Sequence, residues 1–133
     1  MADQDQHKIV FRLSLFRHLR EPCTQPAAKA ALDRILRDEV RHRDFGWDLL
    51  DWLLASPIGE QVPQLVAAQL PAMFAELDQS YGRGNDTIAT DDGSMTDAER
   101  AWGLAPPREY AEILAQTIEK DYRPRFFARG VSL

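Results

Sequence analysis

The stretch that decides the fold reads AKAALDRILRDEVRHRDFGWDLLDWLL, residues 28–54. Apolar or small residues recur along it in steps of three and four, the spacing that marks one face of a helix. Glu39 and His42 occupy the two remaining positions of this face, since residues three apart lie on one side of a helix. The pattern predicts one long helix whose inward face carries a carboxylate and an imidazole. The apolar and small positions are Ala28, Leu32, Ile35, Gly46, Leu49 and Leu53.

A buried pair of Glu39 and His42 requires a binding partner, because an isolated charge in an apolar interior is strongly unfavourable. Carboxylate and imidazole groups that project from helices into a bundle are the metal ligands of di-iron and di-manganese proteins. Metal binding is therefore one interpretation of the pair. The alternative is structural, with Glu39 accepting a hydrogen bond from His42 inside a helix interface.

Residues 34–54, RILRDEVRHRDFGWDLLDWLL, resemble the ligand-bearing helix of the bacterial ferritin-like domain. Asp38-Glu39 and His42 stand at the motif positions of that family, and Gly46-Trp47 follows them.

The tail is similar to the C-terminal extension of larger members of this family. The matching parts are ERAWGL at residues 99–104, APPREY at residues 105–110, and YRPR at residues 122–125 with Gly130. The resemblance implies an all-α fold: a ferritin-like helical hairpin, half of a four-helix bundle, followed by a helical extension. For intact members it also implies a dinuclear metal site that performs oxygen or peroxide chemistry, or iron oxidation.

The chain departs from the family in its number of ligands. A full site takes a Glu from each of two helices and a Glu-x-x-His from each of two more. This chain contains one Glu-x-x-His, so one copy offers half a site. The partners of Glu39 and His42 on the preceding helix are expected near residues 4–7, given equal rise per residue on both sides of the turn.

The first helical seam, continued upstream, selects Gln6 as that partner, with Asp5 beside it. An amide is a poorer ligand for a hard cation than a carboxylate, which predicts a weakened half-site. Asp5 substitutes for Gln6 if the helix enters with a small change of phase.

The flanking segments predict further helices. Ile9, Leu13, Phe16 and Leu19 indicate a helix over residues 7–20. A proline-containing turn then leads to Thr24, the expected N-cap of the long helix, which runs to about residue 55.

A third helix is expected over residues 58–78, kinked or split at Pro71. The polar run at 80–95 is predicted to be a flexible loop. Thr96-Asp97-Ala98-Glu99 is a capping box that opens a short helix, and Pro107 starts the last helix. We therefore divide the chain into residues 1–79, the hairpin with its third helix; 80–95, the loop; and 96–133, the extension.

Composition limits the function further. The net charge of −5 argues against a nucleic-acid or anionic-membrane partner, because both require a basic surface. No apolar run reaches the length needed to span a bilayer. The single cysteine, Cys23, cannot form an internal disulfide, which fits a reducing cytoplasm.

Two functions follow from the sequence. The first is a ferritin-like metalloprotein that binds iron or manganese through Glu39, His42 and either Asp5 or Gln6, and acts as an oxidoreductase. The second is a non-catalytic ferritin-like scaffold or accessory subunit with a degenerate site. We expect a homodimer, because two-fold symmetry presents the same half-site twice. A separate chain that supplies the other half of the bundle is the alternative.

Overall fold

The computed structural model describes the backbone of residues 4–133 and the side chains from Phe11 onward. Its regular structure is entirely helical over the described residues, which confirms the predicted all-α class. The elements are α1 (Gln4–Arg20), α2 (Pro26–Leu54), α3 (Val62–Tyr81), α4 (Asp86–Ala89), α5 (Asp97–Ala101), α6 (Pro107–Thr117), the π-helical turn η1 (Ile118–Tyr122) and α7 (Arg123–Phe127).

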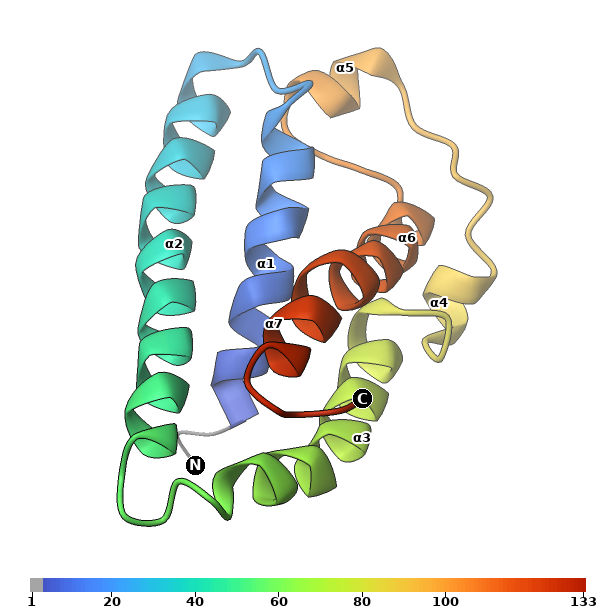
Figure 1. Cartoon of the computed structure of the whole chain (residues 1–133). Helices are drawn as coiled ribbons and strands as arrows, with labels where there is room; N and C mark the ends of the chain where they lie inside the picture. Colours follow the sequence, from blue (N-terminus) through green and yellow to red (C-terminus); the bar gives the residue numbers. More distant parts are fainter. Residues whose placement is uncertain (1–3) are drawn as a thin grey trace.

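Helices α1 and α2 form the predicted antiparallel hairpin (Figure 1). The cap of α2 differs from the prediction: Gln25 is the N-cap and no side chain caps the helix. Instead, the backbone N–H groups of Thr24 and Gln25 both donate to the carbonyl oxygen of Ala101, at 2.9 and 3.0 Å. These two hydrogen bonds attach the turn of the hairpin to the C-terminal extension.

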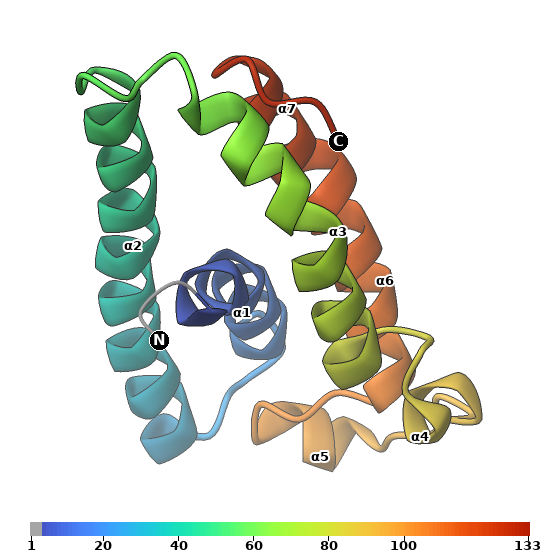
Figure 2. The same ribbon diagram turned by 90° about the horizontal axis from the view of Figure 1, so that it is seen from below.

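Helix α3 turns back across the hairpin and bends midway along its length (Figure 1). Pro71 lies inside this helix, where its ring removes one backbone hydrogen bond and clashes with the preceding turn. The predicted kink at Pro71 is therefore confirmed, while the helix itself continues. Figure 2 shows α1 between α2 on one side and the pair of α3 and α6 on the other.

The buried apolar residues form two clusters. The first, the Phe11 cluster, joins the hairpin to α3 and α6; its buried members are Phe11, Leu15, Leu19, Cys23, Leu32, Leu77, Ala105 and Leu114. The second, the Trp47 cluster, joins the end of α2 to α3 and α7; its buried members are Trp47, Leu50, Val62, Leu70, Tyr122, Phe126 and Val131.

The last helix changes pitch before it ends. Pro124 has no N–H group and its ring crowds the carbonyl of the residue four positions earlier, so an α-helical hydrogen bond is lost there. The chain responds with η1, in which the N–H of Arg123 donates to Ile118. This turn places the buried Tyr122 hydroxyl 3.1 Å from the backbone N–H of Phe11, which donates to it.

The segment between α3 and α5 contains more regular structure than the sequence analysis predicted. The side chain of Asn85 caps α4 by accepting from the N–H groups of Thr87 and Ile88. The Asp91 carboxylate accepts from the N–H of Arg108, in the first turn of α6. The capping box of Thr96 and Glu99 is confirmed, with both of its hydrogen bonds present.

Candidate functional site

Glu39 lies at the middle of α2 and is only 9% exposed, as the sequence pattern predicts. Its Oε2 atom is buried and has no hydrogen-bond partner among the described residues. A buried acceptor without a donor costs about 1–3 kcal/mol in folding free energy. Glu39 is therefore an energetically unfavourable residue on an otherwise apolar helix face.

His42 does not share this burial, so the prediction that both side chains point into the interior is wrong for the imidazole. Its side chain is exposed. Of the buried residues of α2, Leu32 and Glu39 belong to the predicted seam, whereas Trp47 and Leu50 lie to one side of it, so the buried face is rotated relative to the seam. Three residues after Glu39, the helix has turned His42 about 60° away from it.

The cause of this rotation is the Trp47 cluster. The indole of Trp47 packs edge-on against Phe126, with ring centroids 5.1 Å apart. Burying large aromatic side chains outweighs burying the smaller residues of the predicted seam. Gly46, Leu49 and Leu53 are consequently only partly buried.

The two remaining predicted ligands, Asp5 and Gln6, fall in the first turns of α1, outside the part of the structure with described side chains. Among the described residues, no group of three or more His, Cys, Asp or Glu side chains is arranged to hold a metal ion. Glu39 and His42 remain as two potential metal ligands three residues apart on one helix, the first buried and the second exposed.

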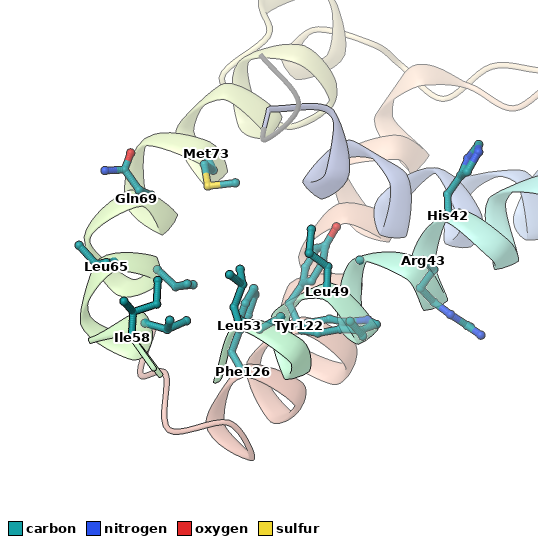
Figure 3. A pocket seen from close by; sticks show the side chains of 15 residues that line it. His42, Arg43, Leu49, Leu53, Ile58, Leu65, Gln69, Met73, Tyr122 and Phe126 are labelled. Atoms are coloured by element: carbon teal, nitrogen blue, oxygen red, sulfur yellow. The ribbon is translucent and has the colours of Figure 1, made fainter. Parts of the chain in front are cut away.

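An apolar groove of about 440 Å³ opens between α2 and α3 beside His42 (Figure 3). Leu49 and Leu53 form its α2 wall, while Leu65 and Met73 face them from α3. Tyr122 and Phe126 belong to its lining on the side of the C-terminal helices. Among its described lining residues, His42, Arg43 and Gln69 carry charged, imidazole or amide groups. Sequence analysis missed this groove because it depends on how α3 crosses α2.

Two arginine side chains lie on the outer side of the Trp47 cluster, and one of them forms an ion pair with a carboxylate. The guanidinium groups of Arg129 and Arg125 lie 4.8 and 5.5 Å from the Trp47 ring centre, within the range of cation–π attraction. Arg129 also pairs with Asp51 at 2.6 Å and thereby holds the pKa of that carboxyl below its usual value. Trp47 Nε1 is buried without an acceptor among the described residues.

A second polar cluster ties the extension to the hairpin. Glu109 on α6 accepts from Arg100 at 2.7 Å and contacts His18 Nε2 on α1 at 2.5 Å. Arg100, and to a lesser degree His18, lowers the pKa of Glu109. Each of these three side chains has a hydrogen-bond partner within the cluster, which indicates a structural role.

Within residues 4–133 no helix combines the length and the apolar character needed to cross a bilayer. Comparison with protein-family models, with curated proteins and with solved structures finds no match. The case for a function therefore rests on Glu39, His42 and the groove beside them.

Proposed function

We propose that this protein is a ferritin-like metalloprotein in which Glu39 and His42 form one half of an iron or manganese site, and that a second chain supplies the other half. The observation that carries the proposal is the Glu39 carboxylate. It is buried in an apolar helix face and its Oε2 atom has no hydrogen-bond donor among the described residues.

A divalent cation removes the energetic problem of that carboxylate. Buried carboxylates in proteins are paired, hydrogen-bonded or bound to a metal. Glu39 has no described ion pair, and His42 follows three residues later on the same helix, where a neutral imidazole can serve as a ligand for iron or manganese. The exposure of His42 leaves its ring free to rotate toward a shared ion.

The exposed position of His42 also supports a site shared between chains. A metal held by Glu39 and His42 alone has most of its coordination positions open, and further ligands must come from outside the described residues. His42 borders the α2–α3 groove, so a chain that covers the groove also reaches the imidazole. Bound iron or manganese would supply redox chemistry, the basis of an oxidoreductase activity. The residues of this chain would hold the ion.

The second candidate is a non-catalytic ferritin-like scaffold with a degenerate site. The amide of Gln6, at a position where the helical register predicts a carboxylate, favours it. The buried hydrogen-bonded couple of Glu39 and His42 that this function entails is missing from the described contacts, because His42 is exposed and Glu39 Oε2 is unpaired.

Metal titration of the purified protein tests the proposal. We expect Mn²⁺ or anaerobic Fe²⁺ to bind to the wild-type chain, and Glu39→Gln or His42→Ala to abolish that binding. Glu112→Gln is the matched control, because Glu112 is an exposed carboxylate on α6, remote in sequence from the site. If the wild-type protein binds neither ion, or if the variants bind as the wild type does, the metal site is refuted in favour of the non-catalytic scaffold.

A further inference from the structure

We draw no further inference here: the strongest candidate, the apolar groove between α2 and α3 together with the exposed side chains of Phe45 and Trp52 on α2, carries none because nothing in the described part of the structure shows what covers it.

Discussion

Replacing Glu39 by methionine should stabilise the metal-free protein. Methionine has a similar length and helix propensity and removes the charge. The carboxylate is 9% exposed and its buried oxygen has no described donor, which corresponds to a penalty of about 1–3 kcal/mol. We expect Glu39→Met to raise the free energy of unfolding in EDTA by this amount, and the melting temperature by about 4 °C for each kcal/mol.

Added metal should close or reverse the difference. An ion at 100 times its dissociation constant stabilises the folded wild type by about 2.7 kcal/mol, whereas the methionine variant has lost the ligand. Differential scanning calorimetry at one fixed protein concentration, with EDTA and then with Mn²⁺, measures both states. Glu112→Met, at an exposed position of α6, should change stability by less than about 0.5 kcal/mol under either condition.

Two results would refute this reasoning. A loss of stability in EDTA on Glu39→Met would mean that the carboxylate has a favourable partner in the folded chain. An equal response of wild type and variant to Mn²⁺ would mean that Glu39 is not a ligand.

Three further substitutions test the fold around the site. Glu109→Gln should cost about 1–3 kcal/mol at pH 7, measured by urea unfolding, because Arg100 and His18 lose their carboxylate. Since the folded-state pKa of Glu109 lies below its usual 4.5, the wild-type advantage is present above that value and should be lost as the pH falls through the lowered pKa. Tyr122→Phe should cost about 1–3 kcal/mol in the same assay, because the N–H of Phe11 loses its acceptor. Gly103→Ala should lower the melting temperature, because Gly103 has φ +81° and a Cβ there would stand 2.8 Å from Leu32 Cδ1; a melting temperature equal to that of the wild type would contradict the described turn.

The hairpin was predictable because local signals agreed with the packing. Two apolar seams, a turn containing two prolines, and the capping box at Thr96 all specify the same helices that the structure contains. The short α4 was missed because its four residues show no periodicity, although Asn85 at the cap position is a signal that identifies such a helix start. The π-helical turn before Pro124 was also missed, since a proline near a helix end predicts a stop more readily than a change of pitch.

The candidate site was predictable only in part. Glu39 was correctly placed in the interior, because it lies both on the predicted seam and on the face of α2 that is buried. His42 was not, because its exposure depends on where α3 and α7 meet α2. The large side chains of Trp47, Tyr122 and Phe126 decide that contact, and they come from segments far apart in the sequence.

The far half of α2 is covered by other elements than its near half. The described part of α1 has 17 residues and α2 has 29, so at equal rise per residue α1 reaches at least the level of Glu39 and His42. Beyond that level, the Trp47 side of α2 is covered by α3 and α7, while the side with Phe45, Leu49 and Trp52 is not. His42, Phe45 and Trp52 are therefore exposed because the described elements that pack on this half of α2 contact its Trp47 side.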